Sequence, residues 1–229
     1  MISVIIPTYN EAERIAQTIM ATHSANGIFP IEIIVADGGS SDNTIGIATG
    51  QDATVIKSEQ KGRAAQMNKG AAAARGDILY FLHADTIPPL HFTEHILKAS
   101  DQGAVAGCFR LLFDHKHWFL KAHSWFTRFD INAVRFGDQS LFITKDVFEK
   151  CGGFREDLQI MEDQEIISRI KTYGKFKVMN AHVTTSARKY LEHGVYKVQS
   201  TFYRLWMLYY LGYPQEYLIK IHRKLSGEN

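Results

Sequence analysis

Residues 78–89 read ILYFLHADTIPP. An unbroken apolar run, residues 78–82, ends in His83-Ala84-Asp85, and two prolines then prevent any regular continuation. Short continuous apolar runs are typical of strands that are buried on both faces of a parallel sheet. The triplet after the run is either an ordinary turn, in which Asp is common, or a site where an imidazole and a carboxylate act together.

The same pattern recurs upstream of this stretch. Apolar runs at residues 2–6, 31–36 and 53–57 predict three more buried strands. The segments between them predict helices that start after Asn10, at residues 44–48 and at residues 62–74. Asn10 is of a type that commonly caps a helix, and Ala12, Ile15, Ile19 and Met20 follow it at helical spacing. This alternation predicts an α/β fold with a mostly parallel central sheet and helices on both faces.

Polar residues follow three of the predicted strands at the point where each strand ends. The segments are Pro7 to Glu11, Asp37 to Ser40, and His83 to Asp85. Ligands of parallel α/β sheets bind beyond the carboxyl ends of the strands. We therefore expect these three clusters to converge on one binding site.

The second half of the chain is less regular. Its patterns predict helices at residues 90–99, 118–129, 147–151, 162–173 and 195–211, and strands at 104–113 and 140–144. There is no internal repeat and no linker-like stretch. We interpret residues 1–190 as one domain and residues 191–229 as its C-terminal helical extension.

The composition excludes several classes of protein. Hydrophobic residues make up 45% and charged residues 22% of the 229 residues, which excludes a disordered chain. A net charge of +2 is not the clustered basic excess of a nucleic-acid-binding protein. The two cysteines, Cys108 and Cys151, are far apart, so they predict neither a zinc site nor a disulfide framework. The sequence shows no signal peptide or spanning segment, and we expect a cytoplasmic protein that can lie at the inner face of the cell membrane.

Three common nucleotide or hydrolase motifs are missing from the sequence. The first predicted strand is not followed by GxGxxG, and neither GxxxxGK[ST] nor GxSxG occurs. A dinucleotide-binding loop, a P-loop and an α/β-hydrolase elbow are therefore disfavoured.

Four segments carry a resemblance to a known family. They are VIIPTYNEAERI, EIIVADGGSSDNT, KGRAAQMNKGAAAARGDILYFLHADT and GGFREDLQIMEDQEIISRI. In this order and spacing, over residues 2 to about 170, they resemble the family-2 glycosyltransferases of the GT-A fold. The resemblance implies an inverting, metal-dependent enzyme of the hexosyl- or N-acetylhexosaminyl-transferase type. It would transfer a sugar from a UDP- or GDP-sugar to an acceptor hydroxyl or phosphate.

The resemblance also assigns the metal site. His83-Ala84-Asp85 occupies the DxD position of the family, where the last carboxylate binds a divalent cation, Mn²⁺ or Mg²⁺, that neutralises the diphosphate. Asp85 is the expected ligand. His83 replaces the first Asp, and it can bind the metal, contact phosphate or ribose, or satisfy a backbone group. Imidazole suits manganese better than magnesium.

Other positions match nucleotide-sugar contacts of the family. The set expected to bind the nucleotide-sugar is Pro7, Thr8, Asn10, Glu11, Asp37, Arg63, His83, Ala84, Asp85 and Arg188. Gly38 departs from the family pattern, in which a second Asp follows Asp37. Arg63 can instead be a solvated residue on a helix face. Arg188 is suited to steady the departing diphosphate, because guanidinium binds phosphate oxygens bidentately.

The segment MEDQE, residues 161–165, carries the expected catalytic base. The resemblance assigns Asp163 to deprotonation of the acceptor, with Glu162 as the next candidate. Two acids near a helix start can instead simply complement the helix dipole. Asp138 and Gln139 are expected on the acceptor side of the site.

Two alternative functions remain. Sugar-1-phosphate nucleotidyltransferases share a similar sheet, but PTYNEAER lacks their Gly-rich phosphate loop. A non-catalytic nucleotide-sugar-binding or membrane-associated scaffold protein with an altered DxD site is the other alternative.

Residues 195–211 are apolar around more than one helix face. That helix, with the basic tail Lys220, His222, Arg223 and Lys224, is expected at a membrane surface, in a homodimer, or in the chain's own core.

Overall fold

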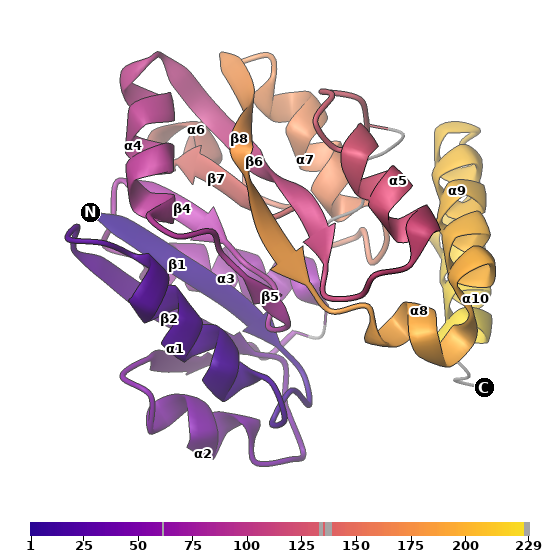
Figure 1. Ribbon diagram of the computed structural model, residues 1–229, viewed down its shortest axis with the longest axis horizontal. Coiled ribbons are helices and arrows are strands. Elements are labelled where there is room, and N and C mark those ends of the chain that lie inside the picture. Colours follow the sequence, from indigo (N-terminus) through magenta and orange to yellow (C-terminus); the bar gives the residue numbers. More distant parts are fainter. Residues whose placement is uncertain (61, 133–134, 136–138, 227–229) are drawn as a thin grey trace.

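The computed structural model describes residues 1–60, 62–132, 135 and 139–226, and it has a central sheet flanked by helices (Figure 1). In the described part, eight strands pair in the order β3-β2-β1-β4-β7-β6-β8-β5. Their bounds are β1 (Ile2–Thr8), β2 (Ile31–Asp37), β3 (Thr54–Lys57), β4 (Ile78–Phe81), β5 (Thr86–Ile87), β6 (Ala104–Phe113), β7 (Leu141–Thr144) and β8 (Lys175–Thr185).

The first four strands form the parallel half of the sheet. β1 lies between β2 and β4 and is parallel to both, and β3 is parallel to β2. The register places Thr8 beside Asp37 at the carboxyl ends of β1 and β2. All seven residues of β1 are buried, as expected for a central strand with helices on both faces.

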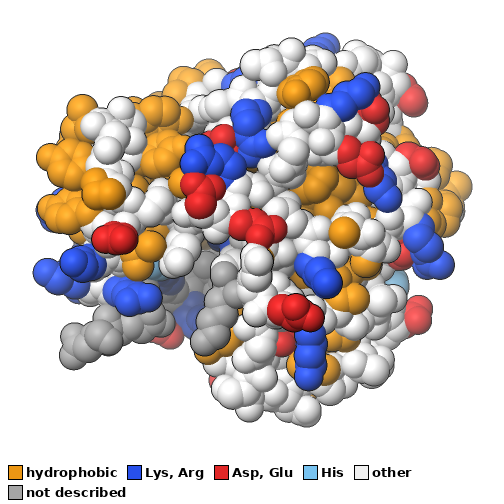
Figure 2. All heavy atoms as spheres, turned by 180° about the vertical axis from the view of Figure 1, so that it is seen from behind, with side chains coloured by type: hydrophobic (Ala, Val, Ile, Leu, Met, Phe, Trp, Pro, Cys, Tyr) orange, Lys and Arg blue, Asp and Glu red, His pale blue; other side chains and the backbone are white. Residues whose placement is uncertain are grey.

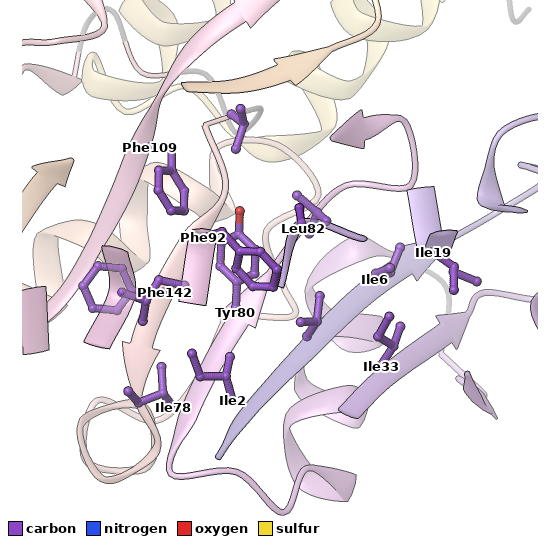
Figure 3. Close-up of a cluster of buried hydrophobic side chains, with 14 of the residues drawn as sticks. Ile2, Ile6, Ile19, Ile33, Ile78, Tyr80, Leu82, Phe92, Phe109 and Phe142 are labelled. Carbon is purple, nitrogen blue, oxygen red and sulfur yellow. The ribbon is translucent and has the colours of Figure 1, made fainter. Parts of the chain in front are cut away.

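Helices cover both faces of the sheet, which confirms the predicted fold class. On one face, α1 (Ile15–Ala25) and α4 (Phe92–Asp101) pack over the core cluster drawn in Figure 3, where the Tyr80 and Phe92 rings stack at a centroid distance of 5.3 Å. On the other face, α3 (Arg63–Ala73), α6 (Lys145–Lys150) and α7 (Glu162–Ile170) bury a second cluster. α2 (Thr44–Thr49) connects β2 to β3, and α5 (Trp118–Phe126) follows β6.

The second half of the sheet is mixed. β7 is antiparallel to both β4 and β6, whereas β8 runs parallel to β6 with two register shifts. The sequence patterns did not predict β8 or β5. β8 has a functional consequence, because its last residue, Thr185, pairs with Thr86 immediately after Asp85. β8 therefore returns the chain to the edge where the first half places its polar loops.

Three helices follow β8 and pack together at one end of the molecule: α8 (Arg188–His193), α9 (Val195–Tyr210) and α10 (Gln215–Ser226) (Figure 1). The helix predicted at 195–211 corresponds to α9, and α10 was not predicted. α9 buries Val198, Leu205 and Leu208 inside its own domain. Val195, Phe202, Trp206 and Tyr209 are partly buried. Tyr196, Tyr203, Met207 and Tyr210 are exposed, so the three alternatives for this helix are not exclusive. None of the described helices is long and apolar enough to cross a membrane.

The start of α1 differs from the prediction. The helix begins at Ile15 with Arg14 at the N-cap position, so Asn10 is not its cap. Asn10 instead has φ 55° and accepts a hydrogen bond from the backbone N–H of Ser41 at 2.8 Å. Asn tolerates this left-handed conformation better than most residues, and its side chain joins the loop after β1 to the loop after β2.

Candidate active site

Asp37 organises the loop at the carboxyl end of β2. Its Oδ1 accepts hydrogen bonds from the backbone N–H groups of Gly39 and Ser40, each at 2.9 Å, and its Oδ2 accepts one from the Ser40 hydroxyl at 2.5 Å. The side chain is 0% exposed. These donors satisfy the hydrogen-bonding needs of a buried carboxylate. The carboxylate therefore shapes the loop, and its direct contact with a base stays a prediction.

Gly38 leaves space for a side chain from α3. Gln66 Nε2 donates to the carbonyl oxygens of Thr8 at 2.6 Å and Ala36 at 3.0 Å, which joins the ends of β1 and β2. A Cβ atom at Gly38 would lie 2.7 Å from the same Nε2. The departure from the family pattern at Gly38 is therefore matched by Gln66, because an Asp side chain at this position would displace the amide.

The segment after β1 runs along this edge of the sheet. Pro7 and Thr8 are buried, Asn10 is exposed, and Glu11 is half-buried. The Thr8 hydroxyl donates to Asp37 at 3.4 Å, so these two expected nucleotide contacts are in contact with each other. Burial and the negative charge of Asp85 raise the pKa of Glu11. Glu11 and Asp85 are therefore electrostatic neighbours across the ends of β1 and β4.

The triplet after β4 presents its three side chains differently. Ala84 is buried, and its carbonyl accepts a hydrogen bond from the Thr18 hydroxyl at 2.6 Å, which fixes the turn against α1. Asp85 lines an open pocket. His83 lies on the side toward Asp163 and lines a small cleft with it. Burial and the positive charge of Arg63 lower the pKa of His83, so the imidazole is neutral.

Arg63 joins the two halves of the site. It stands at the first turn of α3, where its Nε donates to Glu162 Oε1 at 2.6 Å and its Nη2 to Asp163 Oδ2 at 2.8 Å. The side chains are 38% exposed for Arg63, 1% for Glu162 and 18% for Asp163. Arg63 is thus an ion-pair partner of the predicted catalytic acids, and the alternative of a merely solvated residue is wrong.

Glu162 and Asp163 have different environments although they are adjacent. Burial raises the pKa of Glu162 to about 7; Arg63 opposes the shift, and the charge of Asp163 adds to it. Glu162 Oε2 is buried and has no hydrogen-bond partner in the described structure. Asp163, in contrast, lines the open pocket. Of the two, only Asp163 is placed to meet a substrate directly.

The pocket has a volume of about 340 Å³ and brings together residues from distant parts of the chain. Arg63, Asp85 and Asp163 line it, together with Ser186 at the end of β8. Its far wall comes from Lys189 of α8 and from the C-terminal extension, through Phe202 and Leu205 of α9 and His222 of α10. The extension is therefore a part of the site.

Sequence reasoning did not assign Lys189 and His222 to the site. Lys189 Nζ lies 3.0 Å from His222 Nε2 and 5.2 Å from the centre of the Phe202 ring. Burial, Lys189 and Arg63 together lower the pKa of His222 to about 4. The neutral imidazole therefore accepts a hydrogen bond from the ammonium group. The spacing of Leu218, His222 and Leu225 along one helix stripe was a signal for this inward-facing side.

Arg188 lies near Glu11, as the predicted nucleotide edge requires. Its Nη2 is 3.8 Å from Glu11 Oε2, and its guanidinium is partly exposed. The backbone N–H of Arg188 donates to the Ser186 hydroxyl at 3.2 Å, which fixes the turn from β8 into α8. The guanidinium therefore joins the end of β8 to the segment after β1.

The two residues expected on the acceptor side differ in what the structure shows. Asp138 lies outside the described residues. Gln139 is buried, and its Nε2 donates to the carbonyl oxygens of Phe109 at 3.0 Å and Thr127 at 3.2 Å. Both donor hydrogens of the amide are thus used to hold β6, and contact between Gln139 and an acceptor stays a prediction.

The donor set suits a hard divalent cation. Glu11 Oε2 is buried with no hydrogen-bond partner in the described structure, and the charge of Asp85 raises the Glu11 pKa. Two carboxylates that repel each other beside an open pocket match the oxygen ligands preferred by Mg²⁺ and Mn²⁺. Three candidate ligands do not converge within the described residues. Metal binding by His83 therefore stays a prediction.

Comparison with solved structures identifies the fold. The structure is similar to the mannosyltransferase PcManGT from Pyrobaculum calidifontis in complex with GDP-Man and Mn²⁺, with a TM-score of 0.71 and 18% identity over 98% of this chain and 69% of that one. It is also similar to S. aureus TarS 1-349 in complex with UDP-GlcNAc, with a TM-score of 0.66 and 15% identity over 81% of this chain and 58% of that one. The chain therefore has the GT-A glycosyltransferase fold.

The sequence places the chain within one family. Residues 3–158 match the model of glycosyl transferase family 2, and the chain belongs to that family. Glycosyltransferase AglE of Haloferax volcanii is 30% identical over 176 residues. That match covers 69% of this chain and 57% of AglE, so this chain spans little more than half the length of that relative.

Proposed function

We propose that this chain is an inverting, metal-dependent glycosyltransferase that uses a UDP- or GDP-sugar of the hexose or N-acetylhexosamine type. The main support is one juxtaposition. Asp85, at the exit of β4, and Asp163, in the first turn of α7, line the same pocket although 78 residues separate them in the sequence. The position of Asp85 suits the donor diphosphate, and the position of Asp163 suits a general base.

Asp163 is the proposed base. The acceptor oxygen attacks the anomeric carbon while its proton passes to the Asp163 carboxylate. The bond from that carbon to the diphosphate oxygen breaks, and the nucleoside diphosphate leaves. Attack opposite to the leaving group inverts the configuration. Arg63 orients Asp163 through its 2.8 Å hydrogen bond, as a base requires to stay within reach of the nucleophile.

The donor side carries the charges that a diphosphate needs. Asp85 and Glu11 would hold the divalent cation, which supplies charge neutralisation of the leaving group when bound. Arg188 lies near Glu11 and is suited to bind diphosphate oxygens bidentately. Lys189 lines the pocket and adds a second positive charge. Asp37 and Gln66 keep the two nucleotide loops in place.

The acceptor is proposed to enter from the side of the C-terminal extension. Phe202, Leu205 and His222 line that wall of the pocket. We place the protein in the cytoplasm at the inner face of the cell membrane, where the acceptor hydroxyl or phosphate can belong to a lipid-linked molecule.

Release of free nucleoside diphosphate from a panel of UDP- and GDP-sugars, with Mn²⁺ or Mg²⁺, tests the proposal. Metal-dependent release with at least one donor is expected. The scaffold alternative would give nucleotide-sugar binding by calorimetry without release. A product that retains the anomeric configuration would contradict the inverting mechanism.

A further inference from the structure

A cationic groove lies on the outer side of the C-terminal helices. It has a volume of about 590 Å³ between α9 and α10, and five basic side chains line it: Lys197, Arg204, Lys220, Arg223 and Lys224. All five are exposed. Within the part of the chain that the structure describes, no carboxylate lines the groove. None of the five has an ion-pair partner there.

The groove lies on the opposite side of α10 from the catalytic pocket. Leu218, His222 and Leu225 recur at intervals of four and three residues. Leu218 and Leu225 are buried, Leu225 at the base of the groove, and His222 lines the catalytic pocket. Lys220, Arg223 and Lys224 form the outward side of the same helix. One helix therefore joins the wall of the pocket to the wall of the groove.

Exposed aromatic and apolar residues border the basic stripe on α9. Tyr196, Tyr203, Met207 and Tyr210 are exposed and recur at intervals of seven, four and three residues. Lys197 and Arg204 each follow one residue after a member of this stripe, so the two stripes lie about 100° apart around the helix. Figure 2 shows hydrophobic side chains gathered at the end of the molecule formed by these helices, with Lys and Arg side chains beside them.

The apolar surface continues onto α5. The ring of Phe119 lies 5.3 Å from that of Tyr196, and Trp118 and Trp125 are exposed on the same helix. Amphipathic aromatic rings beside basic side chains suit the boundary between headgroups and acyl chains. A protein partner is disfavoured as the occupant, because interface cores are depleted of Lys.

We infer that the groove between α9 and α10 binds the phosphate headgroups of anionic phospholipids and that the exposed rings of α9 and α5 enter the membrane interface beside it. Each basic residue near an anionic surface strengthens binding about fivefold. Docking in this orientation brings the wall formed by Phe202 and His222 close to the bilayer. The inference does not depend on the proposed glycosyl transfer, because it concerns a different face of α10.

Flotation of the purified chain with vesicles tests the inference without any sugar donor. Vesicles of phosphatidylcholine alone are compared with vesicles that also contain phosphatidylglycerol, at low salt. We expect at least tenfold stronger partition onto the anionic vesicles. Binding should fall at high salt, where the screening length shrinks to about 3 Å.

Charge reversal locates the site. The triple variant Lys197→Glu, Arg204→Glu and Lys220→Glu should lose at least tenfold of the partition. The matched control, Lys69→Glu, Lys98→Glu and Lys175→Glu, reverses three exposed charges on α3, α4 and β8 and should bind like wild type. Thermal unfolding of both variants, and a second groove triple with Gln in place of Glu, separate lost binding from lost folding.

Several results would overturn the inference. Equal partition of wild type onto neutral and anionic vesicles is one, and equal loss in both triple variants is another. Sedimentation that shows a salt-resistant dimer, broken by Tyr210→Ser, together with no vesicle binding would assign the face to a second copy of the chain instead. A failed transferase assay would leave each of these results unchanged, so the two proposals are tested separately.

Discussion

The two carboxylate clusters of the site are held in opposite ways. Asp37 accepts its shorter hydrogen bonds from donors within three residues of itself and a longer one from Thr8, and it is fully buried. Asp163 depends on Arg63, which is 100 residues away in the sequence, and it faces an open pocket. The first cluster is held mainly by hydrogen bonds within its own loop. The second exists only when the whole fold has assembled, which leaves its charge available for chemistry.

The largest expected effect is a loss of turnover when Asp163, the exposed acid of the second cluster, is changed. Asp163→Asn keeps the shape of the side chain but removes its ability to take a proton. Turnover should fall by about a hundredfold or more, whereas the affinity for a nucleoside diphosphate should stay within about twofold, because a general base contributes mainly at the transition state. Steady-state kinetics and calorimetry measure the two quantities.

Asp157→Asn, an exposed acid on the loop before α7, is the control. Near-normal turnover of Asp163→Asn would move the base elsewhere, with Glu162 as the next residue to change.

Glu162, the buried acid of the Glu162–Asp163 pair, should make the free energy of unfolding depend on pH. Burial raises the pKa of Glu162 to about 7 from an ordinary value of 4.5, so the folded state holds this proton longer than the unfolded state. The resulting stabilisation is present below pH 4.5 and is lost as pH rises to about 7. Relative to Glu162→Gln, wild type should lose on the order of 2 kcal/mol between pH 5 and pH 7.

Denaturant titrations of the two proteins across this range measure the difference. Glu149→Gln, at an exposed position on α6, supplies the matched variant. If the difference in unfolding free energy changes with pH equally for wild type against Glu162→Gln and for wild type against Glu149→Gln, the effect does not come from burial of Glu162.

Changing Asp85 tests whether this carboxylate binds the metal ion. Asp85→Ala should weaken nucleoside diphosphate binding in the presence of Mn²⁺ about tenfold or more, because a carboxylate ligand of the cation is lost. Binding without metal should change little. Calorimetry with and without Mn²⁺ separates the two effects, with Asp77→Ala as an exposed control at the start of β4. Unchanged metal dependence would remove Asp85 from the metal site.

The smallest effect is expected in the cluster around Asp37. Ser40→Ala removes one of the donors to Asp37, and the acceptor for the backbone N–H of Asn10 at 2.9 Å. The free energy of unfolding should fall by about 1 kcal/mol, the typical net contribution of a hydrogen bond. Ser100→Ala at the end of α4 is the comparison. A loss of several kcal/mol would show that this loop depends on more than local bonds.

The parallel half of the sheet could be predicted because its signals are local. Each of its strands is a nearly continuous apolar run, and β1, β2 and β3 are each followed by a turn and a helix. Asn10 was misassigned because its residue type suits both a helix cap and a left-handed turn, and only the position of Ser41 decides between them.

β8 could not be predicted from its own residues. Its sequence KFKVMNAHVTT has polar residues on both sides of the strand and register shifts against β6, so it shows neither alternation nor a continuous apolar run. Its place in the sheet comes from pairing with residues about 70 positions earlier. The same holds for the site, where Asp85 and Asp163 were found by motif, whereas Lys189 and His222 join it only through the packing of α8 and α10.

The amide of Gln66 links the residue choice at position 38 to the residue choice at position 66. A larger side chain at Gly38 would meet Gln66 Nε2 at 2.7 Å and break the link between the ends of β1 and β2. An acid at position 38 would therefore require the Gln66 side chain to turn away or to be replaced. The two positions should covary across the family. A graft of the acidic pair into this chain should succeed only when both residues are exchanged in one step.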